Sequence, residues 1–99
     1  MKSSSQLQVI SPEIWQLSGD LNFQTVTVLL KEITLNCQHG FPKIINLEQV
    51  SRADSAGLAL LIEIMRLAHQ KQQVIHFSNP PSQLQRIAQA VGLIEILAT

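Results

Sequence analysis

Four consecutive residues combine short polar side chains with a glycine directly before an apolar helix candidate: Asp54, Ser55, Ala56 and Gly57. An apolar strand candidate precedes them at residues 43–47, and the helix candidate runs from Leu58 to Ala68. The first four N–H groups of a helix lack partners within the helix and carry partial positive charge. Such a corner can hold an anion, a phosphate or the edge of a partner protein. The sequence therefore predicts the functional site here, with Leu58 and Arg52 beside it.

Each of these residues also has a purely structural interpretation, which the sequence leaves open. Asp54 as a helix N-cap would stabilise the fold by about 1 kcal/mol. Ser55 could be an ordinary small residue of the first turn. Loops that follow parallel strands gather at one edge of a sheet, so Gln24 and residues 19–22 are expected near Arg52. Asp20 or Asn22 is expected to start a helix rather than bind a ligand.

Several kinds of chemistry lack the residues that they need. The chain has no Gly-x-x-x-x-Gly-Lys-Ser/Thr phosphate-binding loop. Its three histidines (His39, His69 and His76) have no ligand partner at helical spacing, and the single Cys37 is expected to be a small buried residue. A triad of Ser55, His76 and Asp54 fails because adjacent residues cannot both flank one imidazole. We therefore predict no enzymatic activity, no metal and no cofactor.

Composition and charge favour a small folded domain and disfavour nucleic acid and a membrane surface as its partners. The apolar fraction is 45% and the charged fraction 14%, which argues against disorder. Seven basic residues balance seven acidic ones, which disfavours nucleic-acid binding and a basic membrane-binding patch. The longest apolar run, residues 56–62, is far too short to span a bilayer. We expect one cytoplasmic domain, residues 1–99, without direct membrane insertion.

The first half of the chain predicts a hairpin, a helix and a strand. Two extended segments around residues 7–10 and 14–17 flank Ser11-Pro12, and residues 18–20 are expected to end the second. Trp15 is expected in the core or at the rim of this hairpin. Apolar residues at helical spacing then run from Val26 to Cys37. Residues 43–47 are expected to form a central strand buried on both faces.

The second half predicts one more strand, a third helix and a last extended segment. The strand is placed at Val74 to Phe77. Asn79 is expected to cap the third helix, with Pro80 as its first residue and Gly92 just past its end. Ile94 to Leu97 is expected to add a last strand or a strand-like tail. The order ββαβαβα(β) predicts an α/β domain with a central mixed sheet of four to five strands, a parallel centre and three main helices.

The element order and the segment from Asn46 to Leu58 resemble the STAS domain, named for sulfate transporters and anti-sigma factor antagonists. The family pattern is a strand, an aspartate-containing turn with Asp-Ser-Ser-Gly or Asp-Thr-Gly-Gly, and an apolar helix. The resemblance covers essentially the whole chain. It implies a STAS-like fold and a non-enzymatic interaction module that acts through the turn.

Within this family, the segment that begins at Gly57 is most similar to the small STAS subunit of Mla-type phospholipid transporters. That resemblance implies a cytoplasmic accessory subunit, held at the inner face of the inner membrane by the ATPase of an ABC complex. The alternative is an anti-sigma factor antagonist-like regulator that exchanges partners with a serine kinase or anti-sigma factor. The usual phosphate acceptor of such regulators falls on Ala56, which has no hydroxyl. Ser55 remains as the candidate phosphorylation site.

Overall fold

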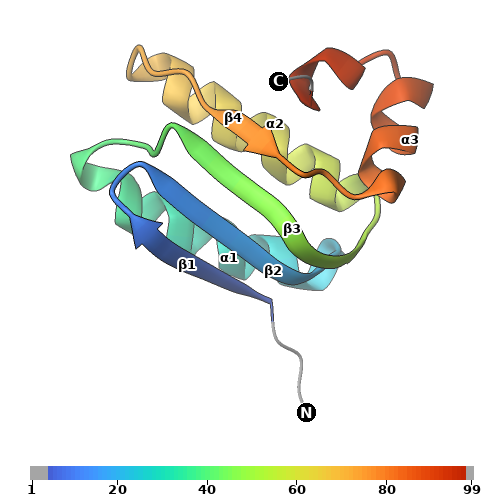
Figure 1. Ribbon diagram of the computed structural model, residues 1–99, viewed down its shortest axis with the longest axis horizontal. Helices are drawn as coiled ribbons and strands as arrows, with labels where there is room; N and C mark the ends of the chain where they lie inside the picture. The colour runs from blue at the N-terminus through green and yellow to red at the C-terminus, as the bar shows by residue number, and fades with distance from the viewer. Residues whose placement is uncertain (1–4, 98–99) are drawn as a thin grey trace.

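A four-stranded mixed sheet in the order β1-β2-β3-β4 forms the centre of the computed structural model, which describes residues 5–97 (Figure 1). Residues 1–4 and 98–99, which the single-domain prediction includes, lie outside the described residues. The elements in chain order are β1 (Gln6–Ser11), β2 (Ile14–Leu21), α1 (Phe23–Asn36), the 3-10 turn η1 (Cys37–His39), β3 (Ile44–Ala53), α2 (Ser55–Gln70), β4 (His76–Ser78), α3 (Ser82–Ala90) and the 3-10 turn η2 (Ile94–Leu97). The predicted order ββαβαβα is confirmed.

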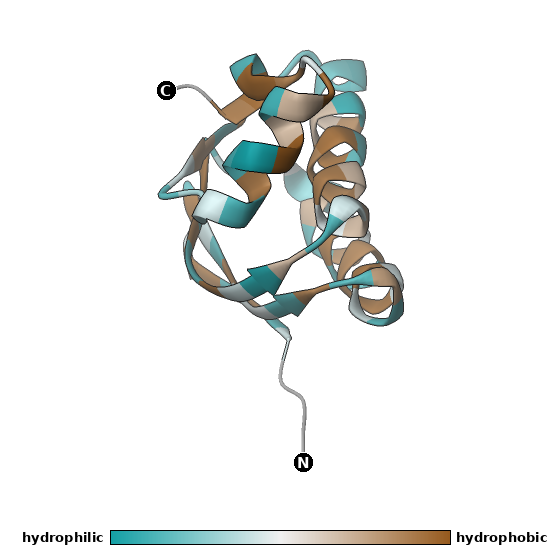
Figure 2. Cartoon of the chain, turned by 90° about the vertical axis from the view of Figure 1, so that its right-hand side faces the viewer, coloured by the Kyte–Doolittle hydropathy of each residue, from teal (hydrophilic) through white to brown (hydrophobic). Residues whose placement is uncertain are grey.

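Strand pairing follows the predicted topology of a hairpin joined to a parallel centre. β1 pairs with β2 antiparallel, while β2–β3 and β3–β4 are parallel. The helices α1 and α2 lie side by side on one face of the sheet, and α3 packs against α2 near β4 (Figures 1 and 2). The core lies between these layers, and it includes Trp15 and Cys37 as predicted.

The strand β3 is longer and less enclosed than predicted. It has ten residues, and buried Ile45 and Leu47 alternate with half-buried Ile44 and Asn46. The prediction of burial on both faces is wrong, because α1 and α2 cover the same face of the sheet. In the described part of the chain, no helix covers the face that carries Asn46.

The strand β2 does not end at residues 18–20 but continues to Leu21. Gly19 has φ of 85°, and the pairing with β3 shifts register between Gly19 and Asp20. A glycine adopts positive φ without a Cβ clash, so it makes an irregularity inside the strand instead of a turn. The added residues bring Asp20 and Leu21 opposite Arg52 and Ala53.

The predicted start of the third helix is also wrong. The helix α3 begins at Ser82, and its N-cap position is Pro81, which makes no side-chain capping bond. A proline disfavours the helical conformation in the residue before it, so Pro81 keeps Pro80 out of the helix. Asn79 instead has φ of 54°, and its Nδ2 donates to Asn46 Oδ1 at 3.1 Å. At the other end, Gly92 follows the C-cap with φ of 78°, as predicted.

The last two predicted strands differ from the structure. β4 covers only His76–Ser78. The strand β3 begins at Ile44, which pairs with His76, so Val74 and Ile75 have no β3 residue beside them. Ile94–Leu97 forms the turn η2 instead of a strand. There the Leu93 and Ile96 N–H groups donate to the carbonyls of Ala88 and Leu93, so local turn bonds replace a sheet ladder.

Candidate partner-binding site

The corner predicted from Asp54–Gly57 lies where β3 passes into α2. Asp54 is the N-cap of α2, and its Oδ1 accepts the Ala56 N–H at 2.8 Å. The Asp54 N–H donates to the Leu21 carbonyl at 3.1 Å, which ties the turn to the end of β2. The capping interpretation of Asp54 therefore accounts for its carboxylate, and it fixes the place where Ser55 begins the helix.

The predicted site residues divide into exposed and buried groups. Arg52, Asp54 and Ser55 are exposed, and Ala56 is half-buried. Gly57 and Leu58 are buried. A Cβ on Gly57 would meet the Leu21 Cβ at 2.9 Å, so this glycine allows α2 to approach the strands closely. Gly57 and Leu58 thus hold the start of the helix in place, and the exposed residues remain available to a partner.

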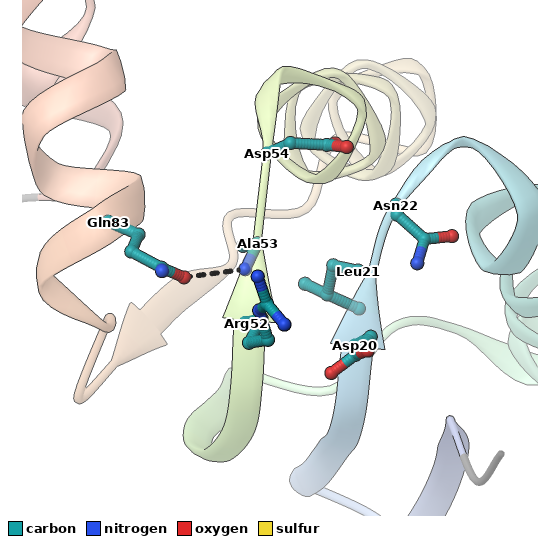
Figure 3. Close-up of a pocket in the computed structure, with 7 residues that line it drawn as sticks. All are labelled: Asp20, Leu21, Asn22, Arg52, Ala53, Asp54 and Gln83. Atoms are coloured by element: carbon teal, nitrogen blue, oxygen red, sulfur yellow. Dashed lines mark hydrogen bonds between the residues drawn. The ribbon is translucent and has the colours of Figure 1, made fainter.

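A polar hollow of about 350 Å³ lies at this end of the sheet (Figure 3). Its lining residues come from the ends of β2 and β3, their helix starts and α3: Asp20, Leu21, Asn22, Arg52, Ala53, Asp54 and Gln83. The sequence predicted that Asp20, Asn22 and Arg52 would lie near the corner, and the structure brings them together. Gln24 is not among the lining residues; its N–H donates to Asn22 Oδ1 at 2.9 Å.

Asn22 also caps α1 through a reciprocal pair of hydrogen bonds. Its Oδ1 accepts the Thr25 N–H at 3.1 Å, and the Thr25 Oγ1 accepts the Asn22 N–H at 3.0 Å. Thr25 Oγ1 further donates to the Asp20 carbonyl at 2.7 Å. This capping box, with threonine at the N3 position, fixes the start of α1 beside the start of α2. The interpretation of Asn22 as a helix-start residue is confirmed.

Gln83 is a residue of this corner that the sequence reasoning missed. Its Oε1 accepts the Ala53 N–H at 2.8 Å, so α3 is linked to the last residue of β3 (Figure 3). The only sequence signal was the Pro80-Pro81 pair, which places the helix start at Ser82 and so puts Gln83 in the first turn.

Ser55 faces a second surface, an apolar groove of about 530 Å³ between α1 and α2. The groove is lined by Phe23, Val26, Thr27, Leu30, Ser55, Ala56, Ala59, Leu60 and Glu63. Phe23 is 82% exposed although it is a large aromatic residue. It was missed because it lies outside the apolar stripe that runs from Val26 to Cys37. An aromatic residue directly after a helix cap, off the buried stripe, was the available signal.

The far end of this groove carries a charged pair. Arg66 donates to the Glu63 carboxylate through Nε at 2.9 Å and Nη2 at 2.6 Å. These hydrogen bonds lower the pKa of Glu63, so its carboxylate is ionised at neutral pH. The groove therefore has an apolar floor, the Ser55 hydroxyl at one end and, at the other, the Glu63 carboxylate paired with Arg66.

The geometry gives no support to the catalytic arrangements considered from the sequence. His76 pairs with Ile44 at the start of β3, whereas Asp54 and Ser55 follow the end of that strand. Among residues 5–97, no three His, Cys, Asp or Glu side chains gather closely enough to hold a metal. None of the helices in this part of the chain is long and apolar enough to cross a membrane.

Comparison with known families identifies the fold. The family model described as "Mlab, STAS domain" matches residues 11–98. The chain belongs to the STAS domain family. STAS domains are in general interaction modules without enzymatic activity. Among curated proteins, none matches the chain.

Solved structures of STAS domains share this fold at low sequence identity. The unphosphorylated form of the anti-sigma factor antagonist SpoIIAA matches 93% of this chain and 84% of its own, with 24% identity and a TM-score of 0.72. The phosphorylated form of the Bacillus cell fate determinant SpoIIAA matches 91% of this chain and 85% of its own, with 23% identity and a TM-score of 0.68. A sulfate transporter family protein from Wolinella succinogenes matches 94% of this chain and 76% of its own, with 22% identity and a TM-score of 0.66.

Proposed function

We propose that this STAS domain is the cytoplasmic accessory subunit that binds the ATPase of a phospholipid-transporting ABC complex, at the inner face of the inner membrane. The observation that carries the proposal is the apolar groove between α1 and α2, with exposed Phe23 at its rim and Ser55 at its end. Large exposed apolar side chains beside a polar rim are typical of protein-binding surfaces. The description of the matching family model supports the Mla-type assignment.

The two surfaces of the corner suit different parts of one partner. A helix of the ATPase would place apolar side chains in the groove, where exposed Phe23 and half-buried Leu30 offer apolar surface that the helix can bury. The polar hollow with Arg52 and Asp54 would form the rim of the interface and fix its orientation. In this proposal, Asp54, Ser55 and Ala56 form the junction of the two surfaces, with Arg52 at the rim and Gly57 and Leu58 supporting it.

Partner switching with a serine kinase or anti-sigma factor is the alternative, and the structural likeness to both forms of SpoIIAA favours it. Such a switch requires a phosphate acceptor in this turn. Ala56 cannot accept phosphate, and Ser55 is exposed at the start of α2. The alternative therefore depends on Ser55 alone.

Co-purification of the ATPase with variants at Ser55 tests the proposal. Ser55→Glu places a bulky negative charge where the partner must exclude water, and burying an unpaired charge costs several kcal/mol. The same charge at a helix N-terminus favours the fold, so the melting temperature should not fall. We expect the ATPase to be lost from co-purification with Ser55→Glu. It should be retained with Ser55→Ala, which removes the hydroxyl without adding charge.

Gln89→Glu is the matched control, because it adds a carboxylate at an exposed position on α3, away from the groove. Normal ATPase binding by Ser55→Glu, with loss of binding by Gln89→Glu, would place the docking surface elsewhere. Capture of a serine kinase in place of the ATPase would support the partner-switching alternative.

A further inference from the structure

The edge strand β1 is unusually open to pairing with another strand. Its residues Gln6–Ser11 contain no charged side chain and no proline, two of the common means of protecting a sheet edge. A third means, a bulge, is confined to the end of the strand, where the pairing with β2 shifts register between Val9 and Ser11. By contrast, the opposite edge strand β4 has three residues and packs against η2. Among residues 5–97, no strand pairs with the outer edge of β1, so its backbone N–H and C=O groups there are open to another strand from Gln6 to Val9.

Apolar side chains flank this edge on the helix side of the sheet. Val9 pairs with buried Trp15 and so points to the same face, yet it is 50% exposed. On α1, Val28 and Leu35 are 58% and 67% exposed. At about 100° per residue, these two share one stripe of α1, on the side remote from the groove with α2. That side of α1 lies toward β1 (Figure 1).

We infer that a second copy of this chain docks along β1, extending the sheet by antiparallel β1–β1 pairing and placing the two α1 helices side by side. An extended peptide from another protein could satisfy the backbone of β1, but it would leave Val28 and Leu35 in water. A second copy supplies a strand and a helix together, in the same relative positions. The inference is independent of the ATPase proposal, because it uses the opposite side of α1.

The sequence of β1 is compatible with this two-fold arrangement. Residues directly opposed in an antiparallel pair point to the same face. A two-fold axis at Gln8 therefore places Leu7 opposite Val9 of the second copy, both on the helix side. Gln6 and Gln8 then lie on the open face. The formal net charge of the chain is zero, so no overall repulsion opposes association.

Light scattering and sedimentation velocity on the full chain, across a range of concentrations, test this inference. We expect a species of twice the monomer mass at high concentration. Val9→Lys and Val28→Lys should each weaken the dimer by more than about tenfold, because a lysine ammonium would be desolvated without a partner. Both positions are at least half exposed, so the monomer should keep its far-ultraviolet circular dichroism.

Val91→Lys, at the C-cap of α3, is the matched control, since Val91 is 58% exposed, as is Val28. The control should leave the dimer intact. A natural chain that remains monomeric at its highest soluble concentration overturns the inference. So does a dimer that survives both Val9→Lys and Val28→Lys, or one that Val91→Lys disrupts to the same extent.

Discussion

Gly57 shows how one missing side chain sets the position of the whole corner. A Cβ there would lie 2.9 Å from the Leu21 Cβ, 3.2 Å from the Leu21 carbonyl oxygen and 3.3 Å from the Ala53 Cβ. These neighbours belong to the ends of β2 and β3, which cannot retreat without disturbing the hollow between them. The glycine of the motif is therefore explained by close packing of helix against strand, and not by an unusual backbone angle.

Gly57→Ala is expected to destabilise the fold by roughly 1–3 kcal/mol, the usual cost of overpacking a core. The direction of this change in stability is informative, because a Gly→Ala change inside an unconstrained helix stabilises the helix by about 1 kcal/mol. Urea denaturation measures the difference. Ser55→Ala, at an exposed position two residues earlier, should change the free energy of unfolding by no more than about 0.5 kcal/mol. Increased stability of Gly57→Ala would contradict the close-packing argument.

Ala56 prevents phosphorylation at the position that anti-sigma factor antagonists normally use in this turn. In the natural chain we expect no phosphate on residue 56 after incubation with a serine kinase of the anti-sigma type, because alanine has no hydroxyl. Ala56→Ser would supply an acceptor at a half-buried position where the backbone N–H is already bonded to Asp54. Phosphopeptide mapping distinguishes the two proteins. Stoichiometric phosphate on Ser55 of the natural chain would instead favour the partner-switching alternative.

At the scale of elements, Gln83 joins α3 to the end of β3 through its bond to the Ala53 N–H. Gln83→Ala leaves that partly buried donor without its acceptor, and we expect a loss of about 1 kcal/mol of stability. Gln85→Ala on the same helix is the matched control, because the Gln85 side chain bonds the Pro80 carbonyl in an exposed position. Hydrogen exchange at Ala53 should accelerate in Gln83→Ala and remain unchanged in Gln85→Ala. Equal exchange rates in the two variants would show that Gln83 does not hold the corner.

The element order could be predicted because each helix and most strands carry a strong local pattern. The stripe from Val26 to Cys37 and the cap at Asn22 are examples of such patterns. The errors fall where neighbours outside the segment decide its conformation. Val74 was placed in a strand, but the start of β3 at Ile44 leaves it nothing to pair with. Ile94–Leu97 is apolar enough for a strand, yet it packs as a turn on β4 and α3.

The location of the candidate site could be predicted from the sequence, but the two surfaces that form it could be predicted only in part. Asp54 and Ser55 marked the corner because a polar turn before an apolar helix is visible in the sequence. The groove required the packing of α1 against α2, which brings Phe23 and Ala59 together from 36 positions apart. Gln83 reaches the polar hollow from a third helix, α3. Such contacts depend on tertiary structure, and no spacing along the chain encodes them directly.

At the scale of the whole molecule, the two proposed interfaces lie on different sides of α1 and can be occupied together. Phe23 and Leu30 face the groove with α2, whereas Val28 and Leu35 lie on the side remote from it. A dimer joined through β1 would therefore present two grooves to two ATPase subunits. This arrangement follows from the fold only if both proposals hold, and each has a separate test.

The balance of charge over the molecule predicts how binding to the ATPase depends on salt. Seven basic and seven acidic residues leave no net charge to steer association, and the one charged side chain that lines the groove, Glu63, is paired with Arg66. We expect the dissociation constant to change by less than about fivefold between low and high salt, the range of a single surface ion pair. Phe23→Ala should weaken binding about 30-fold or more at every salt concentration, as truncation of an aromatic hot-spot residue does. Val91→Ala, which also truncates an exposed apolar side chain but at the C-cap of α3, should leave binding unchanged. A steep loss of affinity with salt, together with normal binding by Phe23→Ala, would show that the polar hollow around Arg52, and not the groove, holds the partner.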